Sequence, residues 1–143
     1  MVSTPNNPLQ AAIYTRLNSF AGLTALIGSN QVFDFVPATA KPPYVLIGDD
    51  TITDNSTKTE SAWEAVMTLH CWDAEKAGRK SVKSILDQMY AALHLKEVNI
   101  NISGFSLVQM RFEWEHTMQD PSVQGQGDRW WHGIHRYRAL IQL

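Results

Sequence analysis

Apolar residues near the start of the chain recur at helical spacing. They follow one another at steps of four, four and three residues and share one face of an amphipathic helix: Leu9, Ile13, Leu17 and Phe20. A polar lead, residues 1–8, precedes this helix, and Gly22 is expected to end it. One further helical turn is expected at 24–27, closed by Gly28.

A second helix is the clearest in the sequence. It follows a turn at 73–78, and its apolar stripe consists of Val82, Ile85, Leu86, Met89 and Leu93. Polar side chains such as Lys80 and Asp87 occupy the opposite side. This stripe predicts a helix packed against a larger apolar surface.

Other segments have the patterns of strands. Residues 44–48 are apolar on both faces, which indicates a strand that is covered on both sides. Residues 62–72 alternate, with the odd positions facing inward. Residues 108–116 alternate with the even positions on one side, and 129–143 form the last strand. A short extended stretch is also expected at 32–36.

The order of these elements predicts a single α+β domain over residues 1–143. A helix is followed by strands, a second helix and two long antiparallel strands. We therefore expect a mostly antiparallel sheet with the two helices packed on one face. The polar segment Asp49 to Lys58 is expected to be a loop, and 120–128 is expected to be a flexible connection.

Composition excludes several classes of protein. A net charge of −2 argues against a protein that binds nucleic acid by neutralising phosphates. The single cysteine, Cys71, permits no intrachain disulfide and no cysteine-based metal site. The chain opens without a signal-peptide pattern, and no apolar run approaches the ~20 residues of a membrane span. We expect a soluble protein, made in the cytoplasm, with no membrane partner.

Catalytic and metal-binding patterns are weak. His132 and His135 lie three positions apart on a strand and therefore point to opposite faces, so they cannot share a metal. We expect partly exposed histidines beside Trp131. Cys71 faces inward and His70 outward, which excludes a nucleophilic pair. We expect no catalytic residue, no metal and no cofactor.

Charged residues on the last two strands allow two interpretations. Glu113 and Glu115 are expected on one strand face, about 7 Å apart, a separation compatible with the paired carboxylates of a glycosidase. Arg111 shares that face, and Arg136 and Arg138 can lie opposite on the next strand. A cross-strand ladder of ion pairs accounts for all five residues and is favoured.

Tryptophans are the other candidates for contact with a partner. Trp130 and Trp131 are adjacent on a strand, so one faces inward and the other outward. Trp72 lies opposite the core face of its strand. Each is either partly covered by its own chain or exposed for contact with another chain.

Three blocks, in this order, resemble the tail-completion (tail terminator) family of tailed phages and gene-transfer particles. The blocks are Pro42 to Gly48 (PPYVLIG), Leu69 to Asp73 (LHCWD) continuing through Gly78 to Leu93, and His132 to Leu140 (HGIHRYRAL). They resemble a proline-led strand, a strand ending in tryptophan before a helix that closes on Ala-Leu, and a closing strand. The resemblance spans residues 9–143.

The resemblance implies an assembly protein without chemistry. Family members form a ring, typically a hexamer, at the head-proximal end of the tail tube in the virion. Such a ring stops tail polymerisation, contacts the major tail tube protein and the neck or head-completion protein, and lets DNA pass through its lumen. This implies a homo-oligomer at the tail–neck junction.

Residue patterns alone suggest an interface. The candidate residues are Asp49, Asp50, Thr53, Asp54, Trp72, Arg111, Glu113, Glu115, Gln124, Gln126, Trp130, Trp131, Arg136 and Arg138. Sheet edges and the two polar segments are expected to supply the contacts. Two alternatives stay open: a neck or head-completion protein of similar fold, and a small-molecule-binding α+β homodimer with an apolar pocket.

Overall fold

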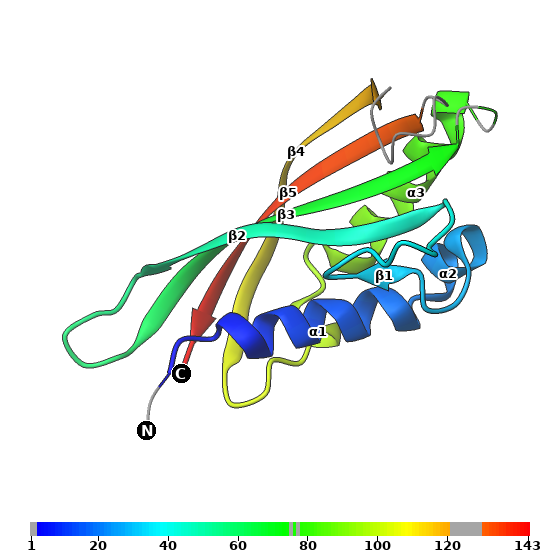
Figure 1. The fold of residues 1–143 in the computed structure, drawn as a ribbon. Helices are drawn as coiled ribbons and strands as arrows, with labels where there is room; N and C mark the ends of the chain where they lie inside the picture. The colour runs from blue at the N-terminus through cyan, green and yellow to red at the C-terminus, as the bar shows by residue number, and fades with distance from the viewer. Residues whose placement is uncertain (1–2, 75, 77, 121–129) are drawn as a thin grey trace.

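The computed structural model describes residues 3–74, 76, 78–120 and 130–143. Within these residues, five strands form one sheet in the order β1-β2-β3-β5-β4 (Figure 1). Neighbouring strands are antiparallel, except that β1 runs parallel to β2. The strands are β1 (Val32–Phe33), β2 (Tyr44–Asp54), β3 (Ala62–Ala74), β4 (Ser106–Asp120) and β5 (Trp130–Gln142).

The helices all lie on one side of this sheet (Figure 1). They are α1 (Asn6–Ser19), α2 (Ala21–Ile27) and α3 (Gly78–Leu93), with a short 3-10 helix, η2 (Glu97–Asn99), after α3. The predicted α+β architecture, with helices on one face of a mostly antiparallel sheet, is confirmed. The side opposite the helices is called the open face below.

The first helix ends earlier than its apolar pattern predicts. Phe20 is extended, with φ −83° and ψ 109°, so α1 stops at Ser19 and Gly22 lies inside α2. Gly28, with φ 92°, closes α2 as predicted, and its N–H donates to the carbonyl oxygen of Thr24 at 2.8 Å. Only glycine adopts this left-handed backbone without strain.

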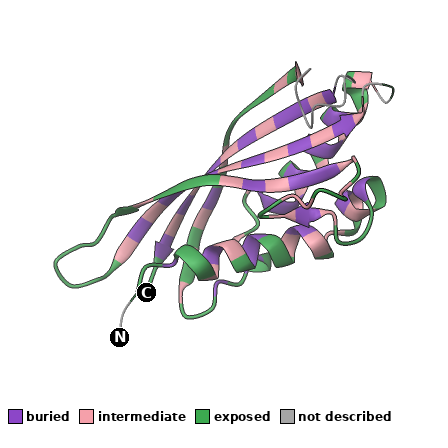
Figure 2. Cartoon of the chain, viewed as in Figure 1, coloured by how far each residue is buried: buried purple, intermediate pink, exposed green. Residues whose placement is uncertain are grey.

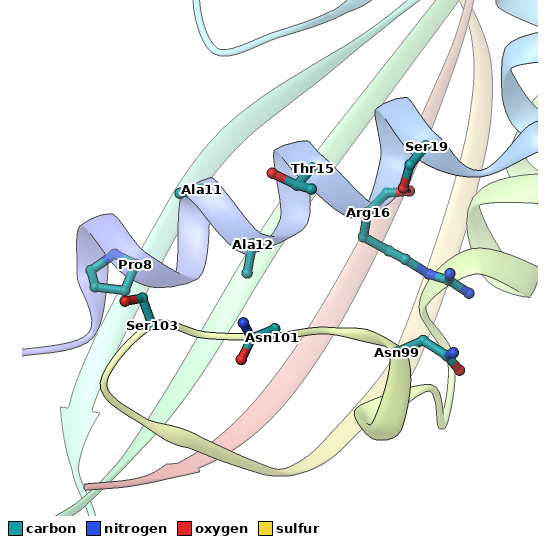
Figure 3. Close-up of a pocket in the computed structure, with 9 residues that line it drawn as sticks. All are labelled: Pro8, Ala11, Ala12, Thr15, Arg16, Ser19, Asn99, Asn101 and Ser103. Carbon is teal, nitrogen blue, oxygen red and sulfur yellow. Dashed lines mark hydrogen bonds between the residues drawn. The ribbon is translucent and has the colours of Figure 1, made fainter.

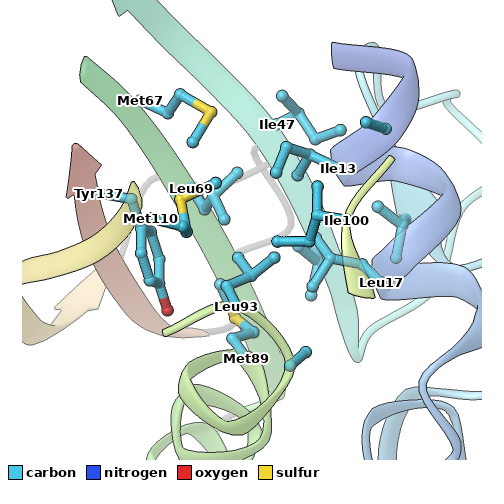
Figure 4. Packing of buried hydrophobic residues seen from close by; sticks show 14 of the residues in the cluster. Ile13, Leu17, Ile47, Met67, Leu69, Met89, Leu93, Ile100, Met110 and Tyr137 are labelled. Atoms are coloured by element: carbon cyan, nitrogen blue, oxygen red, sulfur yellow. The ribbon is translucent and has the colours of Figure 1, made fainter. Parts of the chain in front are cut away.

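The core lies between the helices and the inward face of the sheet (Figures 2 and 4). The predicted alternation of β3 is confirmed, because its odd positions from Trp63 to Asp73 are buried and its even positions are not. Side chains from α1, α3 and the central strands form one cluster, which includes Ile13, Leu69 and Leu93 (Figure 4). Burial of this apolar surface is the main favourable contribution to folding.

Helix α3 approaches the sheet closely at Gly133. A Cβ atom at this position would lie 2.8–2.9 Å from Cys71 Sγ, Leu86 Cδ1 and Val82 Cγ1. Contacts this short are repulsive, so glycine at this position on β5 lets the helix pack directly against the strand. The first and third helices are also tied together, because Arg16 Nε donates to the carbonyl oxygen of Ala92 at 2.8 Å.

The segment predicted to be a loop from Asp49 to Lys58 is mostly strand, so this prediction was wrong. β2 continues to Asp54 and pairs with β3 through Asp54↔Trp63. An irregularity between Ile47 and Asp50 separates the two halves of β2. The β-branched Thr51-Ile52-Thr53 favours an extended chain, which outweighs the polarity of the flanking aspartates.

Strand β4 contains two register shifts, between Leu107 and Gln109 and between Phe112 and Trp114. Each adds one residue without a partner on β5, as in a β-bulge. The second shift reverses the alternation, so that Phe112 opposes Tyr137 whereas Trp114 opposes Arg136. The predicted common face for 108–116 is therefore wrong beyond Phe112.

Candidate assembly interface

No helix covers the open face in the described part of the chain, and several of its apolar side chains are only partly buried. Directly opposed residues on neighbouring strands share a face, so the pairing register defines rows across the sheet. One row contains Leu46, His70, Ile134 and His116, and another contains Thr51, Val66, Arg138 and Arg111.

Aromatic rings cluster at one end of the open face. Trp72 stacks on His132 with ring centroids 4.3 Å apart, and on His70 at 5.5 Å. Tyr44 packs beside Trp72 at 5.5 Å and beside Trp130 at 6.1 Å. His132 is 6% exposed, so the expectation of a partly exposed histidine was wrong.

The two histidines of this cluster bind each other. His70 Nδ1 lies 2.9 Å from His132 Nε2, so one ring donates a hydrogen bond to the other. Burial lowers the pKa of His132 to about 4, helped by repulsion from His70. Burial also lowers the pKa of His70, although Asp49 partly opposes this shift. Both rings are therefore neutral near pH 7.

His135 lies on the helix-covered face, opposite to His132 as predicted, and is fully buried. Its Nε2 is 2.8 Å from Glu115 Oε1 and its Nδ1 is 2.8 Å from the Tyr137 hydroxyl. An ionised carboxylate only accepts, so Nε2 carries the proton and Nδ1 accepts from Tyr137. Burial lowers the pKa of His135, and the hydrogen bond that it donates to Glu115 limits this shift.

This contact corrects the predicted position of Glu115. The second bulge turns Glu115 to the helix-covered face, whereas Arg138 lies on the open face. Glu113 and Glu115 therefore do not form the expected pair on one face. Glu115 instead anchors the edge strand β4 to the buried His135 on β5.

The predicted ladder of ion pairs exists in part. Arg138 Nε donates to Glu113 Oε2 at 2.9 Å, and its Nη1 binds Glu64 Oε1 on β3. Among the described residues, Arg111 and Arg136 form no ion pair. Arg111 sits directly opposite Arg138, and the Arg136 guanidinium lies 5.1 Å from the ring centroid of Trp114. A cation over an indole face is attracted to its π electrons.

The outer part of β2 forms an acidic edge, defined as residues 49–60. Beyond Leu46, this strand pairs only with β3 among the described residues. The edge carries four carboxylates and one lysine, all exposed: Asp49, Asp50, Asp54, Glu60 and Lys58. Thr53 is exposed beside them, and the turn beyond β2 protrudes from the sheet (Figure 2).

The turn at the tip of this edge has its own hydrogen bonds. Ser56 Oγ donates to Asp54 Oδ1 at 2.7 Å and accepts from the Ala62 N–H at 3.0 Å. The Thr57 N–H donates to the Glu60 carbonyl at 2.9 Å. The acidic edge is thus presented by a closed hairpin.

The three candidate tryptophans differ in how exposed their side chains are. Trp130 is 6% exposed and contacts Tyr44, and Trp131 is half-buried beneath the Arg79 guanidinium, 4.7 Å from its ring centroid. They face opposite sides as predicted, and Trp131 fits the alternative of a tryptophan partly covered by its own chain. Trp72 is half-buried on the open face.

Three of four unsatisfied polar atoms lie on the open face. Among the described residues, the buried side-chain atoms without a hydrogen-bond partner are Trp72 Nε1, His132 Nδ1, Arg136 Nε and Asn18 Oδ1. A buried polar atom without a partner costs about 1–3 kcal/mol. These atoms are already covered by the chain itself, so another molecule can bind them only if neighbouring side chains move.

Three features of the described residues bear on catalysis and on a bound small molecule. Burial raises the pKa of the Cys71 thiol well above its ordinary value, which suppresses the reactive thiolate. Within the described ranges, no group of three or more His, Cys, Asp or Glu residues is arranged to hold a metal. A groove of about 290 Å³ lies between α1 and residues 99–103 (Figure 3). Its one charged side chain, Arg16, already binds the Ala92 carbonyl.

The candidate residues thus fall into separate groups. The arginines with Glu113 lie toward β4, and the aspartates with Thr53 lie at the opposite edge. Gln124 and Gln126 lie outside the described residues. The sequence prediction missed His70, Trp114 and His132 on the open face. Outward alternation on β3 pointed to His70, but no sequence signal marked the bulge that places Trp114 beside Arg136.

Comparison with known proteins gives a family and a fold. The family model described as Tail completion protein gp17 matches residues 11–142. No curated protein matches the chain. A solved chain from the "Virion of native gene transfer agent (GTA) particle" has a TM-score of 0.83 at 23% identity, covering 99% of this chain and 100% of that one. A second solved structure, without a descriptive name, has a TM-score of 0.56 at 12% identity, covering 94% of each chain.

Proposed function

Because the chain belongs to the tail completion protein gp17 family, we propose that it is the subunit of a ring that closes the head-proximal end of a phage tail tube. The ring ends polymerisation of the tube and joins the tail to the neck of the virion. DNA passes through its lumen without base-specific contact. As the family resemblance implies, the ring is a hexamer, and its role is assembly without catalysis.

The observation that carries this proposal is the family match over nearly the whole chain. It leaves ten residues at the N-terminal end and one at the C-terminal end outside the matched range 11–142. The fold of the chain is also that of a protein from a gene transfer agent virion. In the described part of the chain, no helix is both long and apolar enough to cross a membrane.

Surface features of the domain support association with other chains. Among the described residues, the helices cover one face of the sheet and leave the open face without a covering layer. Both outer strands, β2 beyond Leu46 and β4, have one unpaired side among the described residues. Unpaired strand edges are ready templates for association. Side-by-side contacts between two different patches close a ring when the rotation per subunit divides the circle.

Three sets of partners follow from this role. Copies of the chain bind one another within the ring, the major tail tube protein binds one side, and the neck or head-completion protein binds the other. We assign the candidate residues on the acidic edge and on the open face of β4 and β5 to contacts between copies. The net charge of −2 fits a lumen that DNA crosses without being held.

A tube-length assay tests the proposal. The tail tube protein from the same particle is polymerised alone and with increasing amounts of this protein, and tube lengths are measured by negative-stain electron microscopy. We expect shorter tubes and additional density at one end only. Unchanged lengths and bare ends, together with binding to the portal side of isolated heads, would favour a neck or head-completion role.

A further inference from the structure

We propose that neighbouring copies join head to tail, with the acidic edge of one copy against an arginine patch on the next. The arginine patch is defined as Arg111, Trp114 and Arg136 on the open face of β4 and β5. The inference rests on the proposed ring and names the two surfaces that close it. The partner for each patch is therefore a second copy of this chain.

The arginine patch has unused capacity for binding. Among the described residues, neither Arg111 nor Arg136 has a carboxylate partner, and the Nε of Arg136 is buried without an acceptor. Trp114 is 38% exposed beneath the Arg136 guanidinium. Exposed indole and guanidinium groups together are typical of residues that dominate the binding energy of interfaces.

The acidic edge offers the complementary chemistry. Its carboxylates, Asp49, Asp50, Asp54 and Glu60, are exposed. None of Asp49, Asp50 or Glu60 forms an ion pair with another described residue. Carboxylates only accept hydrogen bonds and guanidinium groups only donate, so the two patches match in charge and in hydrogen bonding.

The sheet places the two patches toward its opposite edges, the acidic edge on β2 and the arginine patch on β4 and β5. Thr51 on β2, Val66 on β3, Arg138 on β5 and Arg111 on β4 are successive partners. The outer strands β2 and β4 are three strand spacings apart, about 14 Å. Asp50 opposes Met67 and Asp54 opposes Trp63, so these two carboxylates face the helix-covered side of the acidic edge. They meet the arginine patch when the edge of one copy overlaps the open face of the next copy. Repeated contacts of this kind are heterologous, as a ring requires.

Two other occupants fit the arginine patch less well. Two copies meeting through the same patch would oppose arginine to arginine, which is repulsive. DNA would meet Trp114 opposite Arg136, and Val66 and Ile134 on the same face, rather than a continuous basic surface. The charge match thus favours the neighbour's acidic edge.

Charge reversal of each patch tests the pairing. One variant carries Arg111→Glu with Arg136→Glu, a second carries Asp50→Lys with Asp54→Lys, and a third carries all four changes. Ring formation is followed by native mass spectrometry and sedimentation as a function of concentration. We expect each double variant to need at least tenfold more protein to assemble than wild type. The fourfold variant should recover to within about threefold, because its contacts are again opposite in charge.

A matched control separates local from general charge effects. Lys80→Glu with Lys83→Glu makes the same change in net charge as the arginine double variant, but on the exposed side of α3, and it should assemble as wild type does. Circular dichroism and thermal unfolding establish that each variant is folded. A double variant that does not fold is replaced by Arg111→Gln or Asp50→Asn, for which a smaller loss of assembly is expected.

The outcomes distinguish this inference from the proposed function. Wild-type protein that forms no ring and caps no tube contradicts the proposed function itself. Wild-type rings with double variants that assemble normally overturn only the pairing of the two patches. Loss in both double variants without recovery in the fourfold variant also overturns it. Normal rings that no longer cap tubes would reassign the patches to the tube protein.

Discussion

His70 and His132, on the open face of the sheet, are uncharged near pH 7 because both rings are partly or fully buried. Both pKa values are lowered, that of His132 to about 4, mainly because burial penalises the charged ring. A histidine whose folded pKa lies below its unfolded value of 6.5 stabilises the fold fully above pH 6.5. This stabilisation is lost as the pH falls from about 6.5 toward 4, where the folded ring becomes protonated.

The first prediction concerns this loss in acid. The free energy of unfolding of wild type should fall by on the order of 1–3 kcal/mol between pH 6.5 and pH 4 through these histidines, since one pKa unit corresponds to about 1.4 kcal/mol. His132→Gln should lose less over the same window, as measured by urea unfolding at a series of pH values. His116→Gln, at an exposed position on the same face, should change the pH profile less than His132→Gln does, because His116 contributes only the last of the causes that shift the pKa of His132. Identical pH profiles for wild type and His132→Gln would refute the assignment.

Gly133 illustrates how one missing side chain sets the distance between α3 and β5. Gly133→Ala places a Cβ atom within 2.9 Å of three core side chains. We expect a loss of about 1–3 kcal/mol from overpacking, seen as a lower Tm. The same change in a Val82→Ala background should cost less, because one of the three contacts is gone. Equal costs in both backgrounds would show that the close packing is not responsible.

At the level of elements, the helices and the central strands could be predicted from their periodicity. The stripe from Val82 to Leu93 and the inward odd positions of β3 are set by one dominant surface, the core. The outer part of β2 could not be predicted in this way, because Ile52 is the one residue from Asp49 to Asp54 that packs against the core. An edge strand of this kind lacks the apolar alternation that marks central strands.

The bulge in β4, like the outer part of β2, could not be predicted from the sequence. The alternation from Val108 to His116 is regular, yet the strand gains an unpaired residue between Phe112 and Trp114. The gain turns Glu115 toward the buried His135 and Trp114 toward Arg136. Tertiary contacts on the two sides of the strand, rather than its own pattern, therefore select the register.

Deletion of Glu113 tests this view of β4. Because Glu113 is the residue without a partner on β5, its removal leaves the pairs on either side in place and costs only its bond to Arg138. We expect a loss below about 2 kcal/mol and a Tm within about 8 °C of wild type. Deletion of Thr68 from β3 should prevent folding, since it turns half of a central strand inside out. Similar losses for both deletions would contradict the bulge.

For the whole molecule, the domain has one face filled by helices and one left open. Sequence patterns predicted the helix-covered face, because buried apolar residues recur with the period of the helix or strand that carries them. They predicted the second only as scattered candidates, because the order β2-β3-β5-β4 decides which of them meet. That order separates the acidic edge from the arginines. The sequence alone had suggested that both belong to the same interface.

The central claim is that this chain closes into a ring on the end of a tail tube. Native mass spectrometry with negative-stain imaging, of the purified protein alone and after mixing with tail tubes from its own particle, tests it most directly. The account predicts closed rings of a single copy number, consistent with six, or density that caps one end of each tube. A discrete dimer that leaves the tubes bare would contradict it.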